Sequence, residues 1–194
     1  MLWKVTCKED IYPGMWQRWF KNQCVAVGWA SAWGYMLHGK TEGGKGWSTA
    51  RNAINEMKLG DFVVVALNGH RVGRLGQITE KAIQDDQWNP LVPIGPELPD
   101  GEMGRRINVR WELTTGPENQ DLVVQLPEGK TFSSGELRPT VARIYSMTVE
   151  ELRQHMNDQT NWVSLLGKFG YEKALSDYIK IKGVKSLIDL SIEI

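Results

Sequence analysis

The residues with the clearest potential for chemistry lie at Gly34–Thr41, where GYMLHGKT formally matches a phosphate-binding loop. In such a loop, small residues let successive backbone amides surround phosphates at the beginning of a helix. Here the interior of the loop is bulky, and the following EGGKG is a poor start for a helix because glycine has high conformational freedom. No apolar strand ending in Asp is placed to hold magnesium. We therefore expect Gly34–Thr41 to bind neither ATP nor GTP.

Other catalytic chemistry finds little support in the sequence. The three histidines, His38, His70 and His155, are far apart, and there is no HExxH, CxxC or GxSxG motif. Cys7 and Cys24 have no basic neighbour in sequence and are expected to be small buried hydrophobic residues. We therefore predict a binding protein with no catalytic residue, metal site or cofactor.

The tryptophans carry more information. There are nine, and five of them fall within the first 33 residues. Trp3 and Trp111 occupy inward-facing positions of predicted strands and are expected in the core. Trp33, Trp47 and Trp88 instead lie in or beside predicted loops, where binding residues concentrate. A base stacked on such a ring gains roughly 1–3 kcal/mol, and anchoring of the loops is the alternative interpretation.

Charge and hydropathy limit the function classes. The 194 residues include 23 Lys and Arg and 23 Asp and Glu, and 41% are hydrophobic, which is ordinary for a globular protein. With zero net charge, any nucleic-acid binding has to come from a local patch or a pocket. The start MLWKVTCKED is no signal peptide and no stretch approaches 18 apolar residues, so we expect a cytoplasmic protein with reduced thiols and no membrane partner.

The first third of the chain predicts short strands and helices. Strands are expected at residues 1–6 and 25–29, with a short helix at 15–22 between them, and residues 30–47 are expected to be a loop. Ser48 can then cap a helix to about Lys58, closed by Gly60. The apolar stripe of this helix follows the helical period at Ala50, Ala53, Ile54 and Met57.

A β-hairpin is the strongest local prediction. Residues 62–67, FVVVAL, are too apolar for an edge strand. Asn68-Gly69 is a favoured tight hairpin turn, and residues 70–78 form the returning strand. Gly73 and Gly76 in that strand predict a bulge or a close approach of another segment.

The second half predicts further strands and then helices. Residues 85–105 are expected to be a loop; strands are expected at 107–113, 122–126 and 141–145 and helices at 148–156, opened by the capping box Thr148–Glu151, and at 161–180. Trp162 fits a face of the last helix. The predicted fold class is α+β, with a small mixed β-barrel flanked by helices.

Residues 46–78, GWSTARNAINEMKLGDFVVVALNGHRVGRLGQI, resemble the central segment of the EVE and YTH branch of PUA-like domains. The shared pattern is a Trp in a loop, a helix with Arg-Asn, and Met-Lys-x-Gly-Asp before an apolar strand and a Gly-rich returning strand. The later WNPLVPI and RRINVRWEL resemble the second Trp loop and the V-x-W strand of this family. The first thirty residues, ending in VAVGW, look most like the N-terminal specificity domains of McrB-type modification-dependent restriction systems.

The resemblance implies a PUA-like barrel over residues 1–150 that flips one modified base into an aromatic cage. Residues 151–194 would form a C-terminal helical extension that packs on this domain or leads to a motor domain. By position in the family pattern, Trp47 and Trp88 match the aromatic residues of the cage, and Ser48 matches the adjacent polar group. Asn52 is a candidate for binding the edge of the base. Trp29 and Trp33 are candidates for the walls of the pocket.

Arg71 and Arg74 on the returning strand are expected to project to one face, where they could hold phosphates or form a solvated surface. Two functions follow from the resemblance. The first is a reader of modified bases in DNA that serves a restriction system together with an AAA+ GTPase motor and a nuclease subunit. The alternative is an RNA-binding PUA-like domain that acts on tRNA or rRNA.

Overall fold

The computed structural model describes residues 1–9, 13–29, 45–68, 70–81 and 102–165. The phosphate-loop match at Gly34–Thr41, Trp33, Trp88 and most of the predicted C-terminal extension lie outside these residues. The prediction that Gly34–Thr41 binds no nucleotide therefore stays a prediction.

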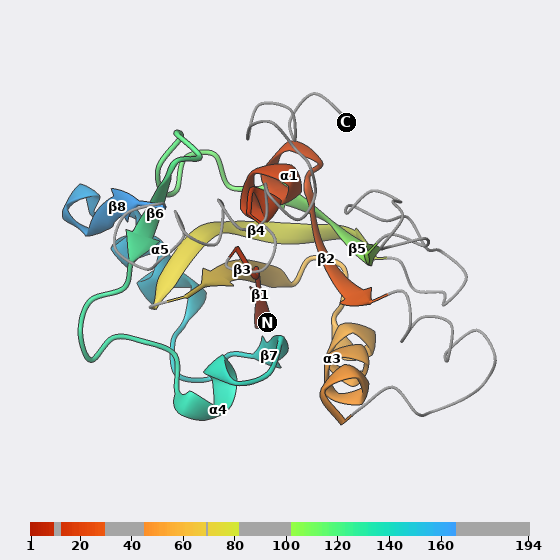
Figure 1. Ribbon diagram of the computed structural model, residues 1–194. Coiled ribbons are helices and arrows are strands. Elements are labelled where there is room, and N and C mark those ends of the chain that lie inside the picture. The colour runs from red at the N-terminus through yellow and green to blue at the C-terminus, as the bar shows by residue number, and fades with distance from the viewer. Residues whose placement is uncertain (10–12, 30–44, 69, 82–101, 166–194) are drawn as a thin grey trace.

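The described elements form an α+β fold built on one large, open, mixed sheet (Figure 1). The strands are β1 (Leu2–Thr6), β2 (Cys24–Trp29), β3 (Phe62–Leu67), β4 (Arg71–Lys81), β5 (Glu102–Trp111), β6 (Leu122–Gln125), β7 (Val141–Arg143) and β8 (Trp162–Ser164). The helices are α1 (Met15–Lys21), α3 (Lys45–Glu56), α4 (Ser134–Leu137), α5 (Val149–Asn157) and the short 3-10 helix η1 (Gln159–Asn161).

The strand order is β2-β5-β4-β3-β1-β7, with β6 paired to β4 and β8 paired to β6. β1 and β3 are parallel, and the other described pairs are antiparallel. The sheet stays open within the described residues, so the predicted small barrel is not confirmed.

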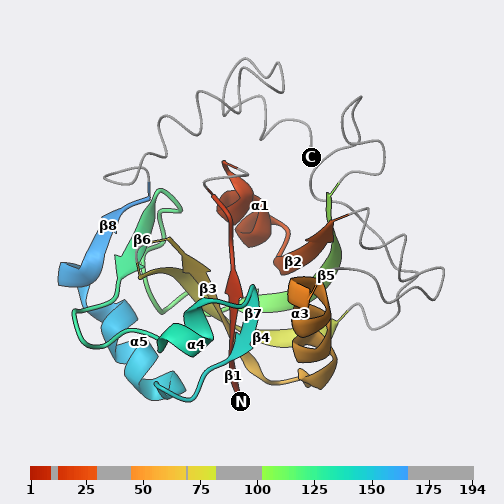
Figure 2. The same cartoon turned by 60° about the horizontal axis from the view of Figure 1, so that its bottom comes forward.

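β3 is buried on both faces, as its apolar sequence predicts. Val63, Val65 and Leu67 belong to one hydrophobic cluster, which also contains buried residues of α1 and α3. Val64 and Ala66 belong to a second cluster, which contains buried residues of α5. Figure 2 shows α3 on one side of β1 and α4 and α5 on the other. Each face of the central strands is therefore covered by different helices.

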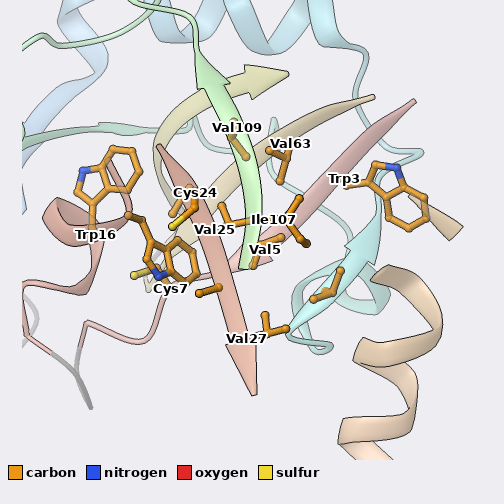
Figure 3. Packing of buried hydrophobic residues seen from close by; sticks show 14 of the residues in the cluster. Trp3, Val5, Cys7, Trp16, Cys24, Val25, Val27, Val63, Ile107 and Val109 are labelled. Atoms are coloured by element: carbon orange, nitrogen blue, oxygen red, sulfur yellow. The ribbon is translucent and has the colours of Figure 1, made fainter. Parts of the chain in front are cut away.

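The predicted core residues are confirmed. Trp3 and Trp111 are buried, and Cys7 and Cys24 are fully buried free thiols. Figure 3 shows Cys7 and Cys24 among the apolar side chains of the first cluster, with Trp16 beside them. These cysteines therefore act as small hydrophobic residues.

The hairpin of β3 and β4 is confirmed, but its turn is longer than predicted. Leu67 pairs with Arg71, which leaves three residues in the connection in place of the two expected. His70 has a φ of 59°, in the left-handed region. Three-residue hairpin loops commonly end on such a residue, and this explains why the returning strand begins at Arg71.

The glycines of β4 have the two roles predicted for them. The register shifts between Val64 and Ala66, where β4 contains one extra residue, so Gly73 lies in a bulge. A Cβ at Gly73 would lie 2.8 Å from the ring of Trp16. A Cβ at Gly76 would overlap Val109 on the neighbouring strand. Only glycine lets the strand approach these side chains so closely.

The helix expected at Ser48 begins three residues earlier, at Lys45. Trp47, expected in a loop, and Ser48, expected as the cap, therefore both lie in its first turn. The amides of the first turn have no acceptor within the helix. The preference for Ser as the cap is worth only about 1 kcal/mol, so other contacts can move the start of the helix by a few residues. The apolar stripe is confirmed, since Ala50, Ile54 and Met57 are buried, but the helix ends at Glu56, two residues before the expected Lys58.

Several other boundaries differ from the predictions: β4 continues to Lys81, β5 ends at Trp111 and not at Leu113, and β7 ends at Arg143. β5 begins at Glu102, so residues 102–105 are strand and not loop. Trp162 lies in β8 and not in a helix, because it pairs with Val124 of β6 and extends the sheet. The capping box at Thr148 is confirmed: its hydroxyl oxygen accepts from the Glu151 amide at 3.2 Å, and its own amide donates to the Glu151 carboxylate at 2.8 Å.

Candidate functional site

The predicted base-binding residues fall on two described elements and two segments outside them. Trp29 is the last residue of β2, and Trp47 and Ser48 lie in the first turn of α3. Asn52 is exposed one turn further along α3. Trp33 and Trp88 lie outside the described residues. The structure therefore describes the backbone positions of Trp29, Trp47, Ser48 and Asn52, and the cage itself stays a prediction.

One end of the sheet joins both outlying segments. Trp29 is paired in register with Glu102 on the neighbouring strand β5 (Figure 1). The segment that contains Trp33 follows Trp29 in the chain, and the segment that contains Trp88 precedes Glu102. Neighbouring strands lie about 4.8 Å apart. The two predicted aromatic segments therefore attach to the fold at adjacent backbone positions, which we call the Trp29–Glu102 end.

A buried arginine ties α3 to β5 near this end. Arg105 is 1% exposed, and its Nη2 donates to the side-chain oxygen of Asn55 on α3 at 3.0 Å. Arginine keeps its charge when buried and donates in a fixed geometry, so this contact orients the helix against the strand. Arg105 was not predicted, although it is in phase with the inward-facing Ile107 and Val109, which was the signal that could have identified it.

The Asp of the family-like Met-Lys-x-Gly-Asp pattern has a positional role. The Asp61 carboxylate accepts from the indole Nε1 of Trp3 at 2.8 Å and from the Lys58 amide at 3.0 Å. Burial alone would raise the pKa of Asp61, but these hydrogen bonds and the nearby N-terminal ammonium outweigh it and lower the pKa. Asp61 therefore joins the segment after α3 to β1 and β3.

Arg71 and Arg74 do not form a solvated face. Both are buried, at 3% and 1% exposure. Arg71 donates to the carbonyl oxygens of Ser164 and Leu165 at 3.3 and 3.0 Å, and Arg74 donates to that of Glu112 at 2.7 Å and to that of Pro117. β4 has paired strands on both sides, and surrounding loops supply acceptors to its arginines. The expected exposed face is therefore not formed by these two arginines, and a phosphate role for them stays a prediction.

The aromatic cluster that the structure does describe belongs to the core. Trp16 meets Trp111 edge to face with ring centroids 5.5 Å apart, and Phe20 stacks on Trp111 at 6.3 Å. The Arg74 guanidinium lies 5.3 Å from the Phe20 ring centroid. Because these rings pack on one another, they stabilise α1 on the sheet rather than form a base-binding cage.

Glu9 is a buried carboxylate that the sequence did not single out. It accepts from the amide of Gly14 at 2.8 Å and from that of Trp16, at the start of α1. Burial raises its pKa to about 7, and the amide hydrogen bonds oppose this rise. With 2% exposure it has no access to a substrate, so its role is to hold the start of α1.

Neither metal chemistry nor a membrane span is indicated by the described part of the chain. There, no group of His, Cys, Asp and Glu side chains is arranged to hold a metal ion. Its helices are all too short or too polar to cross a bilayer.

Comparison with protein-family models gives no match to this chain, and comparison with curated proteins gives none either. The resemblance of residues 46–78 to EVE and YTH domains therefore stays a prediction.

Proposed function

We propose that this chain is a nucleic-acid-binding module that holds one flipped, modified base of DNA at the Trp29–Glu102 end of the sheet. The observation that carries the proposal is the register pairing of Trp29 with Glu102, which attaches the segments of Trp33 and Trp88 at adjacent positions. The sequence resemblance supplies the class of ligand. In this proposal the open sheet belongs to a PUA-like fold.

The described contacts suit a rigid support for such a pocket. Arg105 and Asn55 join α3 to β5, and Asp61 fixes the chain after α3 to Trp3. Binding residues gain affinity when the scaffold beneath them is already ordered, because less conformational entropy is lost on binding. The exposed amide of Asn52 can both donate to and accept from the edge of a base.

The charge balance favours recognition through the base over binding to the backbone. The chain has zero net charge, and the two arginines expected to hold phosphates are buried. Few phosphate contacts mean weak non-specific binding and a shallow salt dependence. Such a module suits the specificity element of a restriction system whose AAA+ motor and nuclease are supplied by other domains or chains.

The test compares Trp47→Ala and Trp88→Ala with the parent protein on duplexes that carry methylated cytosine, hydroxymethylated cytosine or methylated adenine. We expect at least one modified duplex to bind more tightly than its unmodified counterpart, and each substitution to weaken that binding about 5- to 150-fold. The matched control is Trp111→Ala, which removes a buried core ring and lowers the melting temperature.

Two outcomes contradict the proposal. One is equal affinity of the parent for modified and unmodified duplexes. The other is that Trp47→Ala and Trp88→Ala both bind as tightly as the parent. Tighter binding to tRNA or rRNA than to every duplex would instead support the RNA-binding alternative.

A further inference from the structure

A pocket at the other edge of the sheet has features of a ligand site. It has a volume of about 510 Å³ and lies beside the edge strand β7 and the short helix α4. This volume falls within the range of about 300–1,000 Å³ that is usual for small-molecule sites. Small residues make the hollow, namely Ser133, Gly135 and Ala142, and the side chains of Arg143 and Tyr145 line it.

Tyr145 presents an aromatic ring to solvent at this pocket. Tyr145 is 74% exposed and is one of four large hydrophobic residues that are exposed in the described part of the chain. The Arg143 guanidinium carbon lies 4.7 Å from the centroid of the ring. An aromatic face and a cation are thus offered together at one open surface.

The backbone beneath this ring is held by a buried carboxylate. Glu136 is 7% exposed and accepts from the amides of Tyr145 and Ser146 at 2.5 and 3.0 Å. It also accepts from the amide and hydroxyl of Ser133 at 2.7 and 2.8 Å. The position of Tyr145 is therefore set before any partner arrives, which lowers the entropy cost of binding.

Arg143 offers a positive charge beside the ring, and the Glu136 carboxylate that also lines the pocket is occupied by hydrogen bonds from its own neighbours. Within the described residues Arg143 therefore has no carboxylate partner. A guanidinium pairs well with phosphate, and an exposed Tyr face accepts a nucleobase by stacking.

We propose that this pocket binds a nucleotide of single-stranded nucleic acid, with the base stacked on Tyr145 and the adjacent phosphate paired with Arg143. This site is separate from the proposed modified-base pocket. The modified-base pocket lies at β2 and this site lies at β7, and these two strands are at opposite ends of the main strand order. Every base can stack on an aromatic ring, so this contact does not depend on base modification and adds affinity for an unpaired strand.

The test measures the affinity of the full chain for an unmodified single-stranded thymidine oligonucleotide by fluorescence anisotropy. We expect Tyr145→Ala to weaken binding about 5- to 150-fold and Tyr145→Phe to retain it. Arg143→Ala should weaken binding and reduce the slope of log affinity against log salt by about 0.7. The matched control is Leu113→Ala, another exposed hydrophobic residue, which does not line the pocket and should bind like the parent.

The inference is overturned if the parent does not bind the single strand, or if Tyr145→Ala binds as tightly as the parent. Melting temperatures of all variants are measured alongside, and an exposed ring should leave them unchanged. The modified-duplex comparison is a separate arm. If the parent shows no preference for modified duplexes but binds the single strand through Tyr145, only the proposed function is contradicted. If it prefers a modified duplex but single-strand binding does not depend on Tyr145, only this inference is contradicted.

Discussion

Two capping boxes with the same sequence pattern serve different purposes in this fold. Thr148-x-x-Glu151 opens α5 at an exposed position, and the Glu151 carboxylate accepts from the amide and the hydroxyl of Thr148. Ser133-x-x-Glu136 opens α4 at a buried position. There the carboxylate bonds Ser133 and also reaches the amides of Tyr145 and Ser146. The box at Thr148 only caps the beginning of its helix. The box at Ser133 also holds the backbone at Tyr145 and Ser146.

The protonation of the two carboxylates reflects this difference. Backbone and side-chain hydrogen bonds from Thr148 lower the pKa of Glu151. Burial by itself would raise the pKa of Glu136, but the hydrogen bonds from Ser146, Tyr145 and Ser133 outweigh burial and lower the pKa to about 2. A buried capping carboxylate therefore stays ionised when hydrogen bonds from several donors satisfy its oxygens, as they do at Glu136.

The largest expected effect is on the buried box. Glu136→Ala leaves the amides of Tyr145 and Ser146 and the hydroxyl of Ser133 without their acceptor. We expect a loss of about 2–4 kcal/mol in the free energy of unfolding, measured by urea denaturation. A loss no greater than that of the exposed box would show that the added contacts do not stabilise the fold.

A smaller effect is expected in acid. The folded pKa of Glu136, about 2, lies below its ordinary value of 4.5. The native state therefore binds fewer protons, and the stabilisation from Glu136 is complete above pH 4.5 and is lost as the pH falls toward 2. In Glu136→Gln the slope of stability against pH should be shallower in this window. Urea denaturation at a series of pH values measures it, and an unchanged slope would contradict the assignment.

The smallest effect is expected at the exposed box. Thr148→Ala removes the hydroxyl that accepts from the Glu151 amide. The expected cost is about 1 kcal/mol of unfolding free energy, typical of an N-cap. Thr148→Ser, which keeps the hydroxyl, is the control and should retain most of the stability. If Thr148→Ala costs as much as Glu136→Ala, burial does not separate the two boxes.

Local patterns determined much of the fold from sequence alone. The apolar run 62–67, the hairpin into β4 and the Thr148 cap depend on neighbouring residues, so periodicity and turn chemistry were sufficient to predict them. The predictions failed where the deciding contacts come from elsewhere in the chain. Trp162 joins β8 because β6 offers it an edge, and no pattern near residue 162 records that partner.

The candidate site shows the same division. Sequence singled out Trp29, Trp47 and Asn52 by residue type and resemblance, and only the pairing of β2 with β5 showed that Trp29 and Glu102 are neighbours. Arg74 was predicted to share one face of the returning strand with Arg71 and to hold phosphates there, but its carbonyl acceptors lie 38 and 43 residues further along the chain.

The sequence by itself determined most of the strands, the apolar stripe of α3 and the cap of α5, because these depend on interactions within a few residues. Only the tertiary structure decided which charged groups are buried. Lys4 donates to carbonyl oxygens of Leu137 and Pro139, more than 130 residues away. A buried charge is tolerable only where distant segments bring acceptors to it, and those acceptors exist only once the chain has folded.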